Sequence, residues 1–312
     1  MDKDRGLLDL IITRIPGLTI LERGILCRKI NSEEEIKRLS KHDIEIILDR
    51  PMPRQKWIMD DVRIQAEKDA RAANMRGIRW VSLDSPDYPP QIREIYDPPA
   101  VLFYRGNLPD PERPLAAVVG TRHPSPAAAA QAFDISRALG VQDIPVVSGL
   151  ALGIDAMAHR GNLEGGAPTI AVLGSGADAI YPVSNRSLAR RILENNGVIL
   201  SEYPPGTSPM KWHFPARNRI ISALTRGVLI VEAPAKSGAL ITAQFALEQG
   251  RDLWVASSGA VAGHPGLSGF GEGTRKLAAE GARIIYSASD ILDEWKLKEN
   301  LVSDNKEKNL WP

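Results

Sequence analysis

The chain has 312 residues, of which 43% are hydrophobic and 25% are charged, and its formal net charge at pH 7 is +1. These values are typical of a folded globular protein and exclude a largely disordered chain, and the length suffices for one large α/β domain and a small one. The near-neutral charge excludes a general attraction to nucleic acid, so such binding would depend on local clusters among the 39 lysines and arginines.

The first part of the chain, residues 1–76, has helical spacing of apolar residues and almost no strand pattern. We expect four or five short helices there, one of which begins within residues 31–35, where capping side chains precede three acids. Residues 15–19 contain a Pro-Gly pair similar to the hairpin of helix-hairpin-helix modules. DNA contact and a plain turn between two helices both remain open for this segment.

The pattern changes at residue 78 to short extended pieces and prolines, and we expect this connector to add edge strands to a sheet. After Pro114, strands and helices alternate, which is typical of a parallel sheet with helices on both faces. The expected strands are 115–119, 145–148, 169–173, 197–200, 227–231, 252–256 and 282–285. The expected helices are 126–139, 154–164, 186–195, 242–249 and 273–280. The charged residues 293–312 predict a terminal helix and a loose tail.

Two junctions between a strand and a helix are candidate binding loops, because ligands in open α/β sheets bind at the carboxyl ends of the strands. In the first, Gly120 lets the backbone approach a ligand, and Arg122 offers a planar, permanently charged group to a phosphate. In the second, Ser148-Gly149-Leu150-Ala151-Leu152-Gly153-Ile154-Asp155 opens a helix. We expect its backbone amides, the Ser148 hydroxyl and the helix N-terminus to bind an anion together.

Other chemistry is poorly supported. A third junction, residues 173–178, resembles a dinucleotide turn only superficially, because a third glycine is missing and Ile180-Tyr181-Pro182 interrupts the helix. No Gly-Lys-Ser or Gly-Lys-Thr occurs, which excludes ATP hydrolysis by a Walker A loop. The five histidines are scattered without metal-ligand spacing, so we expect no metal and no cofactor.

Three titratable residues are better interpreted as structural than as catalytic. For His159 we favour a structural hydrogen bond, and for Asp155 a helix cap or loop brace. Glu232 ends a hydrophobic strand and is the carboxylate most suggestive of chemistry, because such a position faces the ligand crevice. Bracing of the nearby Arg217 or Arg219 is still its better interpretation.

Residues 211–222 combine cations, aromatic rings and an apolar helical run, the combination that binds single-stranded nucleic acid. We expect Lys211 to contact phosphate and Phe214 to stack on a base, with an ordinary core aromatic as the alternative for Phe214. Arg217 and Arg219 point to different faces of a helix, so at least one of them should be buried and paired. Downstream, a small-residue loop at residues 237–238 follows a buried strand and predicts an anion pocket of backbone amides.

These motifs together closely resemble the DNA-processing protein A family (DprA, also called Smf), the single-strand-binding recombination mediators of natural transformation. The resemblance runs from Trp80 to Leu292. Its markers are Val119-Gly120-Thr121-Arg122, the Ser148 to Asp155 loop with Ala158-His159, Ser201-Glu202-Tyr203-Pro204, Phe214-Pro215-Ala216-Arg217-Asn218-Arg219-Ile220-Ile221, and Ser237-Gly238-Ala239-Leu240-Ile241-Thr242-Ala243.

The resemblance implies an extended Rossmann-like domain at residues 77–292, with a parallel-core sheet flanked by helices, and a small all-α SAM-like domain at residues 1–76. It implies a protein that binds single-stranded DNA, forms a homodimer and loads the RecA recombinase. Together with the reasoning above, it gives a set of expected DNA-binding residues. They are Gly120, Thr121, Arg122, Ser148, Gly149, Leu150, Gly153, Lys211, Phe214, Arg217, Asn218, Arg219, Ser237 and Gly238.

The chain departs from the family pattern in four places. Pro126-Ala127 follows Ser125 where Tyr-Gly is usual, and Ser258-Gly259, preceded by Ser257, stands where Pro-Gly is usual. Gly273-Thr274-Arg275 replaces Gly-x-Asn, which we expect to alter local loop geometry or the dimer contact. Residues 293–312 are too few for the winged helix that many members carry.

The leading hypothesis is therefore a binding protein without covalent chemistry. One alternative is a nucleoside-monophosphate N-glycosidase on the same fold, but residues 234–240 lack the diglycine and the acid of those enzymes. Another is a protein scaffold that has lost DNA binding. The sequence has no signal peptide and no apolar stretch long enough for a membrane span, so we expect a cytoplasmic protein without membrane insertion. The single cysteine, Cys27, allows no internal disulfide.

Overall fold

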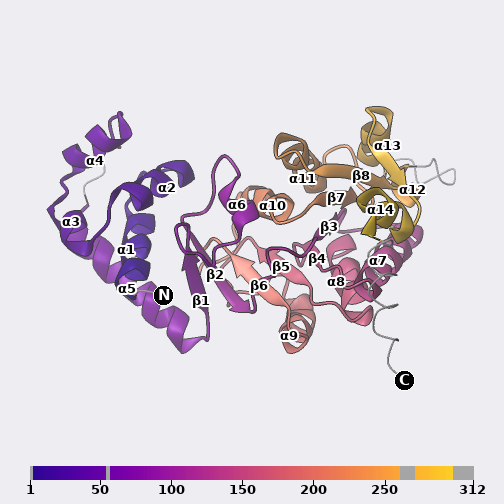
Figure 1. Ribbon diagram of the computed structural model, residues 1–312, viewed down its shortest axis with the longest axis horizontal. Coiled ribbons are helices and arrows are strands. Elements are labelled where there is room, and N and C mark those ends of the chain that lie inside the picture. Colours follow the sequence, from indigo (N-terminus) through magenta and orange to yellow (C-terminus); the bar gives the residue numbers. More distant parts are fainter. Residues whose placement is uncertain (1–2, 54–56, 261–270, 298–312) are drawn as a thin grey trace, which may run out of the picture.

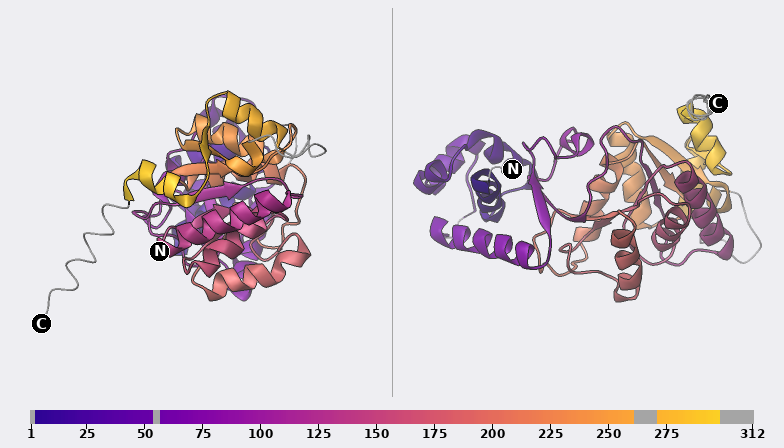
Figure 2. Two further views of the ribbon diagram at one scale, coloured as in Figure 1. Left: turned by 90° about the vertical axis from the view of Figure 1, so that its right-hand side faces the viewer. Right: turned by 60° about the horizontal axis from the view of Figure 1, so that its bottom comes forward.

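The computed structural model of the chain describes residues 3–53, 57–260 and 271–297 (Figure 1). The first part is helical, as predicted, and its helices lie beside the β1 end of a sheet (Figures 1 and 2). They are α1 (Lys3–Arg14), α2 (Ile20–Lys29), α3 (Glu33–Arg38), α4 (Lys41–Leu48) and α5 (Met59–Met75). Side chains that accept hydrogen bonds from first-turn amides begin three of them, namely Thr19, Ser32 and Ser40. The domain boundary at residue 76 stays a prediction.

Within the described ranges, nine strands form one sheet in the order β1-β2-β6-β5-β4-β3-β7-β8-β9. The strands are β1 (Arg79–Ser82), β2 (Val101–Gly106), β3 (Ala116–Val119), β4 (Val146–Ser148), β5 (Ile170–Leu173), β6 (Val198–Ser201), β7 (Gly227–Ile230), β8 (Asp252–Ala256) and β9 (Arg283–Ile285). β3 to β9 pair in parallel, while β1 and β2 add antiparallel strands at one edge. The predicted strands and the edge strands expected from the connector are thus confirmed.

Helices cover both faces of this sheet, which explains why its central strands are buried on both sides. Along β3, Ala116 and Val118 belong to the apolar cluster under α7 (Pro126–Val141) and α8 (Ile154–Glu164). Ala117 and Val119 belong to the cluster on the opposite face. The helices on that face are α6 (Pro90–Arg93), α10 (His213–Ala223), α11 (Gly238–Glu248) and α13 (Glu272–Ala279). The remaining helices are η1 (Val183–Asn185), α9 (Arg186–Glu194), α12 (Ser257–Ala260) and α14 (Ala288–Trp295). This architecture confirms the predicted extended Rossmann-like fold.

Two predicted helices differ in position. The helix expected at residues 242–249 begins at Gly238, because the Ser237 hydroxyl accepts a hydrogen bond from the Ala239 amide and starts α11 four residues earlier. The terminal helix was expected within residues 293–312, and the helix described there, α14, already begins at Ala288, where Ser287 and Asp290 form a capping box. Residues 298–312 of the expected tail lie outside the described residues.

The residues that depart from the family pattern form hydrogen bonds or helix caps in the structure. Ser125 caps α7 and Pro126 occupies its first turn, a favourable helix start. The Gln131 side chain donates a hydrogen bond to the Ser257 hydroxyl and accepts one from the Ser258 amide, each at 2.8 Å. Thr274 is fully buried, and its hydroxyl accepts a hydrogen bond of 2.7 Å from the amide of Ala233, in the loop after β7.

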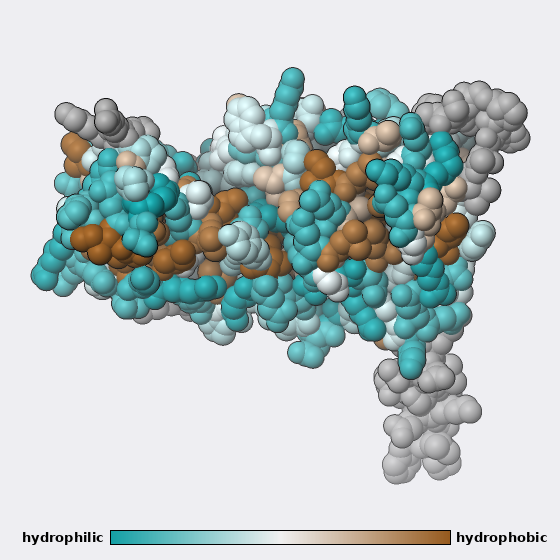
Figure 3. Space-filling model, turned by 90° about the horizontal axis from the view of Figure 1, so that it is seen from above, coloured by the Kyte–Doolittle hydropathy of each residue, from teal (hydrophilic) through white to brown (hydrophobic). Residues whose placement is uncertain are grey.

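The surface is largely hydrophilic. On the face seen in Figure 3, apolar residues gather in an interrupted band along the long axis. Among the described residues, no helix is both long and apolar enough to cross a membrane.

Candidate functional site

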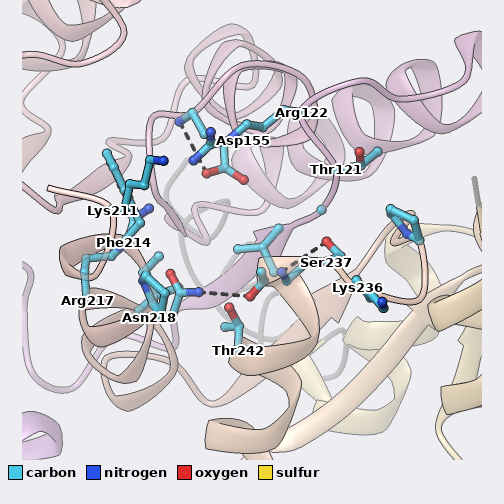
Figure 4. A pocket seen from close by; sticks show the side chains of 18 of the residues that line it. Thr121, Arg122, Asp155, Lys211, Phe214, Arg217, Asn218, Lys236, Ser237 and Thr242 are labelled. Carbon is cyan, nitrogen blue, oxygen red and sulfur yellow. Dashed lines mark hydrogen bonds between the residues drawn. The ribbon is translucent and has the colours of Figure 1, made fainter. Parts of the chain in front are cut away.

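A cavity of about 570 Å³ opens at the carboxyl edge of the sheet, where the strand order reverses. The chain runs from β3 through β4, β5 and β6 to one side, and then returns so that β7 pairs with the other side of β3. Ligands of open α/β sheets bind at such a switch point. We call this the switch-point cavity, and its lining comes from residues 119–122, 151–155, 181, 211–221 and 234–242 (Figure 4).

Exposed cations from three different segments surround this cavity. Arg122 follows β3, Lys211 precedes α10, and Lys236 lies in the loop between β7 and α11. In the part of the chain that the structure describes, none of the three forms an ion pair with a carboxylate. Their positive charges are therefore available to an anionic ligand.

Aromatic rings lie beside these cations. The Phe214 ring is half-buried in the cavity wall, and the guanidinium carbon of Arg122 lies 5.5 Å from its centroid. The Tyr181 ring lies 5.7 Å from the Phe214 ring, centroid to centroid, at an interplanar angle of 42°. The cavity thus offers a flat apolar face next to permanent positive charge.

The floor of the cavity contains a buried pair of opposite charges, Arg217 and Asp155. The Arg217 guanidinium donates a hydrogen bond to the Val172 carbonyl and lies against Gly149, where any side chain would collide with it. Burial lowers the pKa of Arg217 to about 10, so the guanidinium remains charged at neutral pH. Burial also raises the pKa of Asp155, and the Arg217 charge opposes that increase.

In the 148–153 loop, where we expected an anion to bind, the Asp155 carboxylate already accepts hydrogen bonds from two of the backbone amides. Its Oδ2 accepts hydrogen bonds from Gly149 N at 3.1 Å and from Ala151 N at 3.3 Å, which confirms the predicted loop brace. The Ser148 hydroxyl is buried and donates to the Val118 carbonyl at 2.7 Å. Leu150 is buried as well. The Ser148 and Leu150 side chains are therefore not part of the cavity lining, whereas Asp155 is.

Two of the expected glycines are needed for packing. A Cβ on Gly120 would lie 2.7 Å from Ile154 Cγ1 and 2.9 Å from the Glu232 carbonyl oxygen. Gly153 has a φ of +73° and lies against the backbone of Arg122, so it supports the first loop without lining the cavity. Gly149 lines only a small side cavity beside Arg122 and Phe214.

Arg219 also lies outside the cavity, contrary to the prediction. Its side chain is 2% exposed, and its two terminal nitrogens donate to the two carboxylate oxygens of Glu202, each at 2.8 Å. Its Nε lies 3.1 Å from an Asp97 carboxylate oxygen. Since Arg217 is buried too, the prediction that at least one of the two arginines is buried and paired is confirmed.

We expected Glu232 to brace Arg217 or Arg219, and this prediction is wrong, because Glu232 binds a different group. Its buried carboxylate accepts a hydrogen bond of 2.7 Å from the Ser125 amide at the start of α7. His159 makes the predicted structural hydrogen bond, from Nδ1 to the Thr169 hydroxyl at 2.8 Å. Burial, together with the nearby charge of Arg217, lowers the pKa of His159 to about 3.

The opposite wall is the start of α11, joined to α10 by a side chain. The Asn218 amide donates a hydrogen bond of 3.1 Å to the Gly238 carbonyl, and Ser237 caps the helix (Figure 4). The cavity thus brings together nine expected residues from three segments, residues 120–122, 211–218 and 237–238. They are Gly120, Thr121, Arg122, Lys211, Phe214, Arg217, Asn218, Ser237 and Gly238.

Tyr181, Lys236 and Thr242 are among the lining residues that we did not expect to bind DNA. Lys236 immediately precedes the expected Ser237, and Tyr181 lies in the loop after β5, at the same sheet edge. Both positions could have been found from strand ends alone. Within the described ranges, no group of three or more histidine, cysteine or acidic side chains could hold a metal ion.

Known proteins resemble this chain over most of its length. A sequence profile of the family described as DNA recombination-mediator protein A matches residues 79–296. The DNA processing protein DprA of Streptococcus pneumoniae is 44% identical over 209 residues, which are 67% of this chain and 71% of the relative. Its counterpart in Bacillus subtilis is 40% identical over 223 residues, 70% of this chain and 72% of the relative.

Solved structures agree with the sequence matches. The X-ray structure of DNA processing protein A from Streptococcus pneumoniae superposes with a TM-score of 0.75 at 34% identity, covering 94% of this chain and 98% of the other. DNA processing protein A from Helicobacter pylori has a structure described for its single-stranded DNA binding mode. It superposes with a TM-score of 0.59 at 30% identity, covering 71% of this chain and 97% of the other. The chain therefore belongs to the DNA recombination-mediator protein A family.

Proposed function

We propose that this protein binds single-stranded DNA in the switch-point cavity, protects the strand and loads the RecA recombinase onto it. One observation carries the proposal: Arg122, Lys211 and Lys236 converge from three segments on a cavity whose wall holds the Phe214 ring. Cations suit the phosphates, and an aromatic face suits the bases of a strand whose bases are unpaired. The single-stranded DNA binding described for the Helicobacter pylori protein supports the same proposal.

The cavity favours binding over catalysis. Among the described residues, Asp155 is the single carboxylate in its lining, and that carboxylate already accepts two backbone hydrogen bonds beside Arg217. A glycosidase-type reaction needs a free acid or base at the substrate. We therefore propose a role without covalent chemistry.

Fluorescence anisotropy of a labelled oligo-dT strand across a salt series, with a duplex of equal length as control, tests DNA binding. We expect preference for the single strand and little dependence on base sequence. Three phosphate contacts give a log–log salt slope of about −2. Equal binding of duplex and single strand, or an affinity that does not change with salt, would contradict the proposal.

RecA loading is tested on a strand that is first coated with single-strand-binding protein. We expect the wild-type protein to shorten the lag of RecA filament assembly, and Lys211→Glu to lose this effect together with DNA binding. Lys68→Glu, which changes an exposed lysine on α5, is the matched control.

The resemblance to the family also implies a homodimer. Sedimentation equilibrium tests this implication, and a particle of twice the chain mass is the expected result.

A further inference from the structure

A second cavity, of about 170 Å³, lies between the first two helices and the sheet edge. We call it the helical-side cavity. Arg14 and Arg23 line it from α1 and α2, and Phe103, Glu202 and Tyr203 line it from β2 and the segment after β6. The helices and the sheet thus form this cavity together.

Most charges in the helical-side cavity are already paired. Arg14 forms a two-pronged ion pair with Asp69, with Nη2 2.7 Å from Oδ1. Glu202 is held by both terminal nitrogens of Arg219. Two of the lining charges are therefore neutralised by neighbours behind the cavity wall.

Arg23 differs from the other charged residues of this cavity. Its Nε is buried, and no described group accepts a hydrogen bond from it. No carboxylate in the described part of the chain lies within ion-pairing distance of its guanidinium. Burial lowers the pKa of Arg23. The charge of Glu202 opposes this shift, and the charge of Arg14 adds to it. An anionic group that entered the cavity would supply the missing acceptor and relieve the repulsion between the two arginines.

Aromatic rings connect the two cavities over the start of α10. Tyr203 stacks on His213, with ring centroids 3.9 Å apart, and the Trp212 ring meets the His213 ring edge-on at 5.9 Å. The next residue, Phe214, lines the switch-point cavity. Trp212 is 64% exposed, which is unusual for so large an aromatic side chain. Its ring can therefore stack on a base.

We propose that a single strand bound in the switch-point cavity continues across Trp212 to the helical-side cavity, where Arg23 binds one of its phosphates. This inference rests on the proposed function and extends its binding site to the N-terminal helices. Trp212 supplies the stacking surface between the cavities, and Arg23 supplies the charge at the far end. The second subsite comes into use only when the strand is long enough to reach it.

Strand length separates the two subsites experimentally. We would measure anisotropy with one oligo-dT of about 4 nucleotides and one of about 20, against wild type and the variants Arg23→Ala, Trp212→Ala and Lys211→Glu. We expect Arg23→Ala and Trp212→Ala to bind the short strand like wild type and the long strand at least about fivefold more weakly. Lys211→Glu should weaken both.

Two further variants provide controls. Arg28→Ala removes an exposed charge from the same helix, α2, and should bind both strands like wild type. Trp212→Phe keeps a flat ring and should restore most of the long-strand affinity that Trp212→Ala loses. Circular dichroism melts check that each variant folds.

The possible outcomes distinguish a failure of the second subsite from a failure of the proposed DNA binding. Wild-type binding of the long strand by Arg23→Ala and Trp212→Ala, with loss of binding by Lys211→Glu, would overturn the second subsite and leave the proposed function intact. Wild-type binding of both strands by Lys211→Glu would contradict the proposed function itself. Unchanged long-strand binding with reduced RecA loading would also overturn the inference, and would assign this surface to a protein partner.

Discussion

The guanidinium of Arg122 lies over the ring of Phe214, with 5.5 Å between the guanidinium carbon and the ring centroid. The two residues come from different parts of the chain, one from the end of β3 and the other from the first turn of α10. The contact holds a planar cation beside an aromatic face at the wall of one cavity. A nucleotide that entered there could meet a phosphate-binding group and a stacking surface together.

Arg122→Ala removes the cation of this pair. We expect binding of oligo-dT to weaken at least about tenfold, because a phosphate contact is lost, and the thermal midpoint to stay nearly unchanged, because the side chain is exposed. Anisotropy and a thermal melt measure the two quantities. Arg190→Ala on α9 is the matched control, since that arginine is exposed and forms an exposed ion pair with Glu194 one turn away. Full affinity in Arg122→Ala would remove this residue from the site.

Lys236 offers a test that the sequence did not suggest. Lys236→Ala should weaken oligo-dT binding on the order of tenfold and reduce the log–log salt slope by about 0.7, the value for one phosphate contact on a single strand. Lys68→Ala should change neither quantity. An unchanged salt slope in Lys236→Ala would mean that the strand does not approach the loop between β7 and α11.

The strand ends were the most predictable part of this site. Apolar runs followed by small residues identified the loops after β3 and β7, and the alternation of strands and helices gave the sheet that brings them together. Helical spacing could also predict that Arg217 and Arg219 diverge. It could not predict that both are buried, because their partners Asp155, Asp97 and Glu202 come from distant segments.

The loop after β4 shows why a motif alone was insufficient. Its glycines and its position before α8 suggested an anion site. In the structure, the Asp155 carboxylate of the same segment accepts the Gly149 and Ala151 amides, so the loop contains its own anion. Whether an acid folds back onto a loop depends on backbone conformation, here including a φ of +58° at Leu150, and composition does not reveal this.

Arg219 should matter for stability and not for direct contact with DNA. Arg219→Ala leaves Glu202 and Asp97 without their buried cation, so we expect the free energy of unfolding to fall by about 3 to 5 kcal/mol. Urea unfolding followed by circular dichroism measures this change. The double variant Arg219→Met with Glu202→Leu should recover part of the loss, because two apolar side chains leave no unpaired charge. A stability loss below 1 kcal/mol for Arg219→Ala, about the value of an exposed pair, would contradict the buried ion pair.

His159 predicts how stability depends on pH. Its pKa is about 3 in the folded protein against 6.5 as the ordinary value, so below pH 6.5 the unfolded chain binds a proton that the folded protein does not. The free energy of unfolding should therefore fall as the pH falls from 6.5 toward about 3. This residue contributes at most about 1.4 kcal/mol per pH unit to that fall.

His159→Gln removes that contribution. Urea unfolding of both proteins between pH 5 and pH 8 should give a steeper acid loss for wild type than for the variant, whatever the difference in their stabilities at pH 8. Parallel curves would show that the folded protein accepts a proton on His159 as readily as the unfolded chain does.

Photochemical crosslinking tests most directly whether a single strand lies in the switch-point cavity. An oligo-dT strand carrying 5-iododeoxyuridine would be bound, irradiated and digested, and the crosslinked residues identified by mass spectrometry. We predict crosslinks to Phe214 and Tyr181, the rings that line the cavity, and their loss when unlabelled single strand competes. Crosslinks confined to segments outside the cavity, from a strand that binds to saturation, would contradict the account.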